Sequence, residues 1–518
     1  MRHPKLRGTA AMALLLLTHL PDIARAQAGP AGPVRRLSVA DAVALALEQN
    51  LGIQADRLAP QIQDVAVAQA RTFWVPNASA GLNNVSQNTP ATSALAGGQN
   101  KITDTRLTSS FGVNQILPSG ANYSVGWNSF RATSTNIFQT FNPLINSNLS
   151  LSFTQPLLRN FKIDSYRQQL EASRKDRASA DVQLESTIQA TSRNVRNAYW
   201  ELVYQIDNLK AQQQSLDLAR RLLADNEKRV QIGTMAPIDI VEAQSEVARN
   251  EEVVIVAEAG IKQAEDRLRA LILNPSAPDF WTQTIEPAEA MAFSPQTIDV
   301  DGAVRHALST RTDVRLAKNE LEKSDINIRF QRNQALPDVS AQASYQSNAA
   351  GGILLSPLSS IPLDGNVTRT VVSQRSFGSV LGDVVTNAFP TWTFGLTVSY
   401  PVGHSAAEAN VARAQLQKSQ AQIQLQNTEL TIATQVRDAA RQVQTNQKRV
   451  DTSRAARALA ERRLEAEEKK FAAGIQISFF VFQAQRDLAQ ARTNELRAMA
   501  DYNKSLVDFE AVQETALR

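Results

Sequence analysis

Residues that most often carry out chemistry are scarce in this chain. Its 518 residues include no cysteine and four histidines. His306 and His404, the two outside the N-terminal segment, match no metal-site or catalytic-triad spacing. No glycine-rich loop followed by lysine is present to hold a phosphate. The sequence therefore predicts no enzyme, and neither catalytic residues, a metal nor a cofactor.

The most distinctive group of side chains in the chain is apolar and comes soon after a single glycine. Gly474 ends a long polar segment, and Phe479, Phe480, Val481 and Phe482 come soon after it. Four consecutive residues cannot share one helix face, because each turns by about 100° from the last. Phe482 is expected to pack between helices, whereas Phe480, about 200° away, either lines an aperture or touches a partner. A narrow phenylalanine ring would resist wetting and so gate ions without charge.

The N-terminus has the pattern of an export signal. A basic start, an apolar run at Leu14–Leu17 and the sequence Ala24-Arg25-Ala26 predict a secretory signal peptide over residues 1–26. No other segment approaches the roughly 20 consecutive apolar residues of a membrane-spanning helix. Without cysteine there is no disulfide and no lipidated N-terminus. The formal charge of +4 is small for this length and predicts no nucleic-acid partner. The mature protein is expected to be periplasmic, secreted or an outer-membrane β-barrel protein.

An internal duplication organises the chain. Residues 37–80 align with 298–341 without a gap at an offset of 261, which carries Pro76 onto Pro337. Further along, an offset of 241 carries Gly233 onto Gly474. We predict a first repeat at 37–273, a linker at 274–297 packed around the midsection, and a second repeat at 298–518.

Each repeat contains long helices with a seven-residue spacing of apolar residues, which indicates coiled-coil packing. The predicted helices are 38–75, 165–232 and 238–272 in the first repeat, and 405–473 and 478–515 in the second. Pro60 has no counterpart in the second repeat and should kink or interrupt the first helix. Arg457 stands at an apolar heptad position, where it is tolerable if its stem packs and its charge reaches water. Two short helices can lie end to end beside one long helix.

Between the prolines, apolar and polar residues alternate. The regions 77–156 and 338–402 contain runs of about ten residues with this period, as outer-membrane β-strands have. The stretch ILPSGAN (116–122) predicts a tight turn, so the first repeat would carry an additional hairpin around 105–131. So few strands cannot close a barrel within one chain, and an open sheet in lipid leaves unsatisfied backbone groups. The pattern therefore requires several copies of the chain.

In its order of elements the chain resembles the outer membrane efflux protein family, the TolC-like channels. The resemblance covers the mature chain and rests on Pro76, Pro337 and the motifs LSVADAVALALEQN (37–50), FTQPLL (153–158), VSYPVG (398–403), KRVQIGTMAPIDIVEAQ (228–244) and KKFAAGIQISFFVFQAQ (469–485). It implies an α+β membrane protein, in which a long antiparallel coiled-coil tunnel continues a transmembrane β-barrel shared by a homotrimer.

The resemblance also implies function and partners. Such channels lie in outer-membrane lipid, extend into the periplasm, and dock a periplasmic adaptor and an inner-membrane pump of the RND or ABC type. They export drugs or, by type I secretion, proteins. The adaptor-docking turns at the periplasmic tip would be Gly233-Thr234 and Gly474-Ile475. Neither the substrate nor the particular pump can be read from the sequence.

The aperture residues of the family are only partly present. Where the type member has aspartates around the aperture, this chain has Phe480 and Gln483. An arginine of the family's gate falls on Gln476 and a tyrosine on Phe471, while the acidic position of the first repeat is kept as Asp239. These residues are the candidate gate, but an aspartate ring and the family's salt-bridged lock are not expected. The alternative hypothesis is a soluble periplasmic coiled-coil adaptor or scaffold, which explains the heptads but not the paired β-runs.

Overall fold

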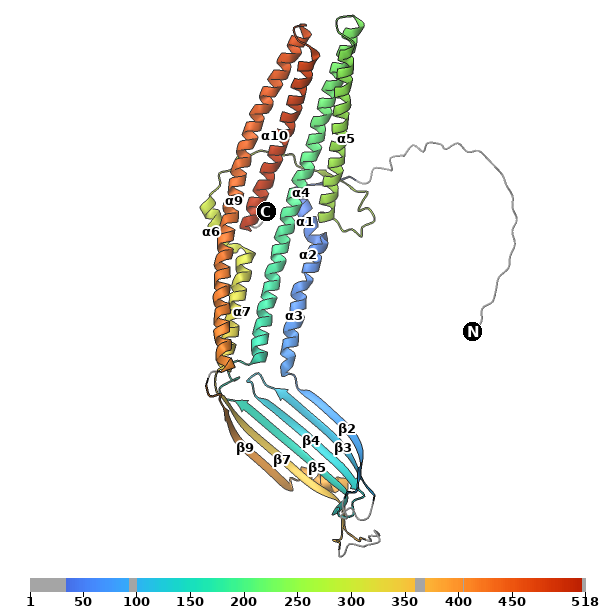
Figure 1. The fold of residues 1–518 in the computed structure, drawn as a ribbon, viewed down its shortest axis with the longest axis vertical. Coiled ribbons are helices and arrows are strands. Elements are labelled where there is room, and N and C mark those ends of the chain that lie inside the picture. Colours follow the sequence, from blue (N-terminus) through green and yellow to red (C-terminus); the bar gives the residue numbers. More distant parts are fainter. Residues whose placement is uncertain (1–33, 93–99, 359–368, 404, 515–518) are drawn as a thin grey trace, which may run out of the picture.

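The computed structural model describes residues 34–92, 100–358, 369–403 and 405–514, so the predicted signal peptide lies outside the described residues. A curved antiparallel sheet occupies one end of an elongated molecule, and helices run away from it to two hairpin tips at the other end (Figure 1). Among the described residues, no helix is both long and apolar enough to cross a membrane.

The two long helices match residue for residue. Helices α4 (Ser165–Gln231) and α9 (Ala406–Ala472) have 67 residues each and are displaced by the same 241 positions as the sequence repeat. At about 1.5 Å per residue each is roughly 100 Å long. An acceptor side chain caps each N-terminus: Asp164 accepts from the Arg167 N–H, and Ser405 forms a capping box with Glu408.

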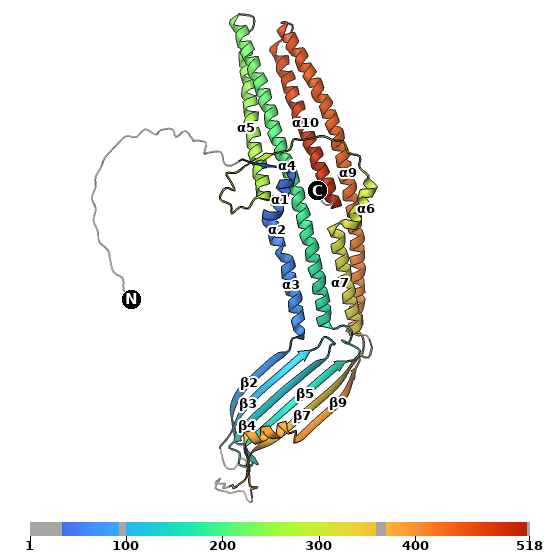
Figure 2. The ribbon, with the colours of Figure 1, turned by 180° about the vertical axis from the view of Figure 1, so that it is seen from behind.

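Shorter helices complete the two hairpins. Helices α5 (Ile238–Ile272) and α10 (Ser478–Gln513) fold back along the distal halves of α4 and α9, and further short helices cover the halves nearer the sheet (Figures 1 and 2). The expected side-by-side arrangement of two short helices and one long helix is therefore present.

The first predicted helix, 38–75, is not continuous. It consists of α1 (Val39–Gln49), α2 (Leu51–Asp56), α3 (Leu58–Arg71) and the 3-10 turn η1 (Thr72–Trp74). Its first break, at Asn50, recurs at the equivalent Arg311 between α6 (Val300–Thr310) and α7 (Thr312–Gln334), so it belongs to the repeat.

The second break, at Arg57, occurs in the first repeat alone and agrees with the expected effect of Pro60. Pro60 lies in the first turn of α3, where its missing N–H costs little. At the first break, Asn50 is extended; its side chain accepts from the Ile53 N–H (3.2 Å) and donates to the Leu271 carbonyl (3.0 Å). That side chain thus caps α2 and fixes the bend against α5.

The sheet contains the predicted additional hairpin. Its long strands are antiparallel throughout, in the order β2 (Asn77–Pro90), β3 (Lys101–Ile116), β4 (Asn122–Ser134), β5 (Phe141–Pro156), β7 (Asp338–Leu355) and β9 (Phe389–Ser399). The β3–β4 turn places Gly120 at φ +83°, in the left-handed region that favours glycine. Strand β8 (Val371–Arg375) pairs with the far end of β7, beyond β9.

Helix α8 (Phe377–Val385) was not predicted. Its Val380 and Val384 side chains are buried against Ile145 and Ala349 of the sheet. The Ser376 hydroxyl caps its N-terminus by accepting from the Ser379 N–H. The helix has only nine residues, so the i, i+4 spacing of Val380 and Val384 is too short a signal to mark it as a helix from sequence.

The segment between the repeats crosses both hairpins. Strand β6 (Thr284–Pro287) pairs in parallel with β1 (Val34–Leu37). The Tyr199 hydroxyl of α4 donates to the Leu37 carbonyl and accepts from the Glu289 N–H, both at 3.1 Å. The Tyr502 hydroxyl of α10 donates to the Ser294 carbonyl at 2.7 Å. These bonds tie residues 284–294 to the middle of both hairpins.

The heptad residues form the helix interfaces. Val195, Leu202 and Leu216 of α4 are buried, as are Val436, Val443, Val450, Leu464 and Phe471 of α9. Arg457, at an apolar heptad position, forms ion pairs with Glu461 and with the buried Glu495 of α10, so its charge contacts carboxylates as well as water. Burial lowers the pKa of Arg457, but the two carboxylates outweigh it and the pKa is raised.

Candidate functional site

The backbones of the two hairpin tips are alike. Gly233 (φ +77°) and Gly474 (φ +73°) each follow the last turn of a long helix. In each case the glycine N–H donates three residues back, and the next N–H donates five residues back: Thr234 to Arg229 at 2.9 Å and Ile475 to Lys470 at 3.0 Å. This pattern is the Schellman motif, in which glycine accepts the left-handed conformation that other residues resist. Gly233, Thr234, Gly474 and Ile475 are all exposed.

The second tip is closed by apolar packing. Val481 and Phe482 are 1% and 2% exposed. The cluster around them draws on all four helices of the hairpins and contains Leu222, Ala243, Leu464, Phe471, Ala484 and Leu488. Phe482 therefore packs as the helical pattern predicted, and it joins the two hairpins at the tip.

Phe480 points out of this cluster. It is 38% exposed, and its ring lies edge to face with that of the exposed Phe479, the centroids 5.7 Å apart. Two apolar rings are thus presented on the first turn of α10. Their exposure in the single chain fits either a constriction made with other copies or a contact with a partner.

The remaining candidates lie at the same level of the tips. Gln483 is exposed, and Gln476 and Asp239 are half-buried. The offset of 241 makes Asp239 the structural equivalent of Phe480, each near the start of the returning helix. The Asp239 carbonyl accepts from the buried Asn226 side chain at 3.5 Å, and its carboxylate forms no ion pair with any residue that the structure describes. One tip thus places a carboxylate where the other places a phenyl ring.

Two contacts that the sequence did not reveal tie the tips to each other. The Arg229 guanidinium lies 4.3 Å from the centroid of the Phe471 ring and donates to the Phe471 carbonyl at 3.3 Å. Arg486 of α10 forms an ion pair with Glu246 of α5 (2.9 Å), whose side chain is only 5% exposed. The salt-bridged lock of the family was not expected, and this chain links its hairpins through other residues. No local pattern marks such pairs, because their partners are about 240 residues apart.

Polar contacts continue between α4 and α10 toward the middle of the molecule. Gln212 donates to the Thr493 hydroxyl at 3.0 Å, and Arg193 pairs with Asp508 at 2.6 Å. Glu201 contacts both Arg497 and Lys504. Burial raises the pKa of the Glu201 carboxyl, but Lys504 and Arg497 together outweigh it, so the pKa is lowered.

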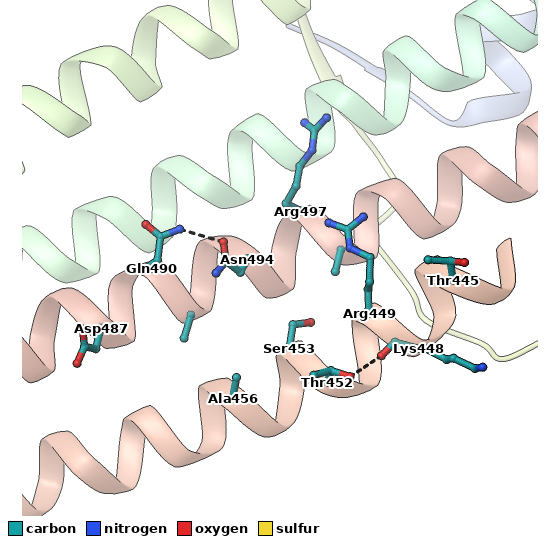
Figure 3. A pocket seen from close by; sticks show the side chains of 12 residues that line it. Thr445, Lys448, Arg449, Thr452, Ser453, Ala456, Asp487, Gln490, Asn494 and Arg497 are labelled. Carbon is teal, nitrogen blue, oxygen red and sulfur yellow. Dashed lines mark hydrogen bonds between the residues drawn. The ribbon is translucent and has the colours of Figure 1, made fainter. Parts of the chain in front are cut away.

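A groove of about 760 Å³ runs between α9 and α10 (Figure 3). Its lining is small, polar or charged and comprises Thr445, Lys448, Arg449, Thr452, Ser453, Ala456, Asp487, Gln490, Ala491, Asn494, Arg497 and Ala498. Arg497 points from it toward α4, where it reaches Glu201 (Figure 3). Among the described residues, no group of three or more side chains is arranged to hold a metal ion.

Taken with the duplicated sequence, two helical hairpins that extend from an amphipathic antiparallel sheet define the protomer of an outer-membrane channel. The profile of the outer membrane efflux protein family matches residues 42–272 and 303–512, and the chain belongs to this family. It is therefore a component of an efflux duct that lies in the outer membrane and extends into the periplasm.

Solved structures share the fold over most of the chain. The CmeC outer membrane channel of Campylobacter jejuni is 16% identical, with a TM-score of 0.62 over 92% of this chain and 85% of that one. The VceC outer membrane protein of Vibrio cholerae is 15% identical, with a TM-score of 0.61 over 92% and 95%. The open state of the MtrE outer membrane channel of Neisseria gonorrhoeae is 15% identical, with a TM-score of 0.61 over 93% and 89%. A search of curated protein sequences gave no match.

Proposed function

We propose that three copies of this chain form one passive export duct, whose sheets close into a barrel in the outer membrane and whose hairpins form a tunnel in the periplasm. The observation that carries this proposal is the two-faced sheet. One face of β9 presents Trp392, Phe394, Leu396 and Val398, all more than 60% exposed in the single chain, and the other face presents threonines. Apolar side chains facing lipid and polar ones facing a lumen are typical of a membrane barrel.

The family supports the same assembly. Outer membrane efflux channels work as homotrimers with adaptor and pump partners. We propose that a periplasmic adaptor contacts the turns Gly233-Thr234 and Gly474-Ile475, together with the groove between α9 and α10. The energy would come from an inner-membrane RND or ABC pump, and the cargo would be drugs, other small molecules or, in type I secretion, proteins. The alternative of a soluble adaptor leaves the apolar sheet face without a role.

The gate in this proposal lies at the tip. Three copies of Phe480 would narrow the aperture, with Gln483 and Gln476 on the same helix and turn, and Asp239 would contribute the charge at this level. An apolar constriction resists wetting, so it blocks ions without a charged ring.

Two measurements test the proposal. In fractionated cells the protein should appear as a detergent-extracted trimer of the outer membrane, and recovery of a soluble monomer would contradict the duct. In planar bilayers Phe480→Ala should raise the single-channel conductance several-fold, whereas the exposed Val241→Ala on the first hairpin should not. Equal conductance of wild type and Phe480→Ala would remove Phe480 from the aperture.

A further inference from the structure

The two repeats contribute unequally to the sheet. The second supplies two long strands, β7 and β9, whereas the first supplies four, because β3 and β4 are inserted between β2 and β5. Each of these six strands has at least 11 residues, which is enough to cross a bilayer when tilted. The question is whether the inserted hairpin belongs to the membrane wall or lies beside it.

The side-chain pattern places the hairpin in the wall. Directly paired residues project to the same face of a sheet, and the paired residues Ala80, Phe111, Trp127 and Leu149 follow one face from β2 to β5. From β5 the same face continues through Leu151 and Tyr345 to Trp392. The opposite face carries polar and small residues, among them Ser110, Gly112, Asn128, Asn148, Gln346 and Thr391. In the half of the sheet nearer the helices, an apolar face and a polar face therefore continue through β3 and β4. In the far half the faces mix, with Phe130 and Leu144 on the polar side and Ser129 and Arg131 on the apolar side.

The free edges of the sheet are β2 on one side and, on the other, β9 with the short β8 beyond it. Among the described strands β2 pairs only with β3, and β9 only with β7. Because six long strands alternate in direction, the β9 edge of one copy meets the β2 edge of the next in an antiparallel sense. The closed sheet then needs no further strand.

The internal duplication predicts the register of this contact. In the chain itself, the junction between repeats is β5 against β7, where Ser152 pairs with Ser344. The shift of 245 that carries Pro156 to Pro401 carries Ser152 to Thr397, and the shift of 261 carries Ser344 to Asn83. Thr397 of one copy should therefore lie opposite Asn83 of the next.

This register agrees with an independent property of the sheet. It sets Leu82 opposite Val398, and both lie on the apolar face, Leu82 through its pairing with Ser109 of β3 and Val398 through its pairing with Val339 of β7. A slip of one residue would turn one strand's apolar side chains toward the lumen. The side-chain pattern, which excludes slips by an odd number of residues, thus agrees with the register that the duplication predicts.

Building on the proposed trimer, we infer that the shared barrel has eighteen strands, six from each chain, and that β9 pairs with β2 of the neighbouring copy in the register Thr397 to Asn83. For strands about 4.8 Å apart and tilted by about 40°, eighteen strands give a backbone diameter of roughly 36 Å, against roughly 24 Å for the twelve that two strands per repeat would give. The outer opening of the duct would therefore be about 1.5 times as wide as that of a twelve-stranded barrel.

The register is tested by cross-linking. Because the chain has no cysteine, Asn83→Cys with Thr397→Cys supplies the only thiols for a short bifunctional thiol reagent. We expect covalent dimers and closed trimers on a denaturing gel. The matched control, Ser152→Cys with Ser344→Cys, sits at the equivalent junction within one chain and should leave the monomer mass unchanged. Asn83→Cys with Leu396→Cys places the thiols on opposite faces and should not cross-link.

The strand number is tested by imaging. End-on electron microscopy of the purified wild-type trimer should show a wall about 1.5 times as wide as that of a variant lacking residues 91–134. This deletion removes β3 and β4 and joins Pro90 to Thr135. Both lie at the start of β3, where Pro90 pairs with Lys101 and Thr135 donates to the Thr103 carbonyl. Equal widths in the two proteins, or a wild-type wall near 24 Å, would overturn the inference.

The outcomes separate this inference from the proposed function. A native mass of one chain in detergent would contradict the trimer itself. A trimeric mass without the Thr397–Asn83 cross-link, while the intrachain control reacts, would overturn the register and leave the duct in place. If the deletion variant does not assemble, the width of the wild-type wall alone decides the strand number.

Discussion

The two hairpin tips share a backbone and differ in nearly everything attached to it. Both end a 67-residue helix in a Schellman motif, and both return on a helix that starts four or five residues after the glycine. The second tip buries Phe482 and exposes Phe480, whereas the equivalent residues of the first are Val241, which is 58% exposed, and Asp239. The duplicated fold has thus kept its backbone geometry through glycine, while its side chains diverged to a packed apolar tip and a more open tip.

The largest expected difference between the tips concerns their packing. Phe482→Ala should lower the free energy of local opening at the second tip by about 3–5 kcal/mol, because it empties a buried site. The equivalent Val241→Ala should change the first by less than about 0.5 kcal/mol. Hydrogen exchange of peptides covering 464–488 and 223–247 measures both. Similar effects at the two positions would mean that the tips are packed alike.

The second largest difference is expected in the stability that ion pairs contribute near the two tips. Arg486→Ala leaves the buried Glu246 carboxylate with the long contacts to Arg249 (3.5 Å) and Asn250 (3.4 Å), and it should cost about 1–3 kcal/mol in local stability. Arg463 pairs with Asp487, the repeat equivalent of Glu246, but both of these side chains are about half exposed. Arg463→Ala should therefore cost less than about 1 kcal/mol. Urea titration followed by limited proteolysis at the tips would compare them, and a larger loss for Arg463→Ala would contradict the assignment of Glu246 as the link between hairpins.

The glycines should behave alike despite these differences. A Cβ at Gly233 or Gly474 meets no atom within 4 Å, so only the left-handed backbone resists substitution. Gly233→Ala and Gly474→Ala should each cost about 1 kcal/mol in local stability. Hydrogen exchange at the last turns of α4 and α9 measures the two effects. A destabilisation well above about 1 kcal/mol at one tip alone would show that the Schellman motif of that tip also depends on a contact made by its glycine.

The smallest expected effect extends the comparison below the tips. Glu201 of the first repeat contacts Lys504, whereas its repeat equivalent, Gln442, has no charge. Because the folded-state pKa of Glu201 is lowered, its contribution is present above the ordinary value of 4.5 and is lost as the pH falls through the folded value. Wild type should lose about 1 kcal/mol more than Glu201→Gln on acidification below pH 4.5. Thermal unfolding across this pH range tests the difference. Parallel profiles of stability against pH for wild type and Glu201→Gln would show that the contact between Glu201 and Lys504 does not stabilise the fold.

Local periodicity explains which parts of this fold could be predicted. The heptads and the two offsets located α4, α5, α9 and α10, and alternation located the strands, because each signal repeats over ten residues or more. The break at Asn50 depends on one extended residue and a bond to α5, and α8 depends on burial against the sheet. The break leaves no period in the sequence, and the period of α8 extends over only nine residues.

The same reasoning applies to the candidate site. Helical geometry predicted that Phe480 and Phe482 face opposite ways, and glycine predicted both turns. The links from Arg229 to Phe471 and from Arg486 to Glu246 join distant parts of the chain, so the sequence alone could not pair them. Whether the candidate residues form an aperture depends on copies of the chain that a single sequence does not place.

The hydrogen bonds of Tyr199 and Tyr502 to the segment between the repeats have a mechanical consequence. They hold α4 and α10 in place about halfway along the hairpins. Some 34 residues of α4 lie between Tyr199 and the first tip, so roughly 50 Å of helix extends beyond the point that is held. A bend of about 5° in α4 at this point would move the tip by roughly 4 Å, which is of the order of a phenyl ring's width, without moving the half of α4 nearer the sheet. The sheet end need not move at all, so the outer mouth can stay rigid in the membrane while the far end swings.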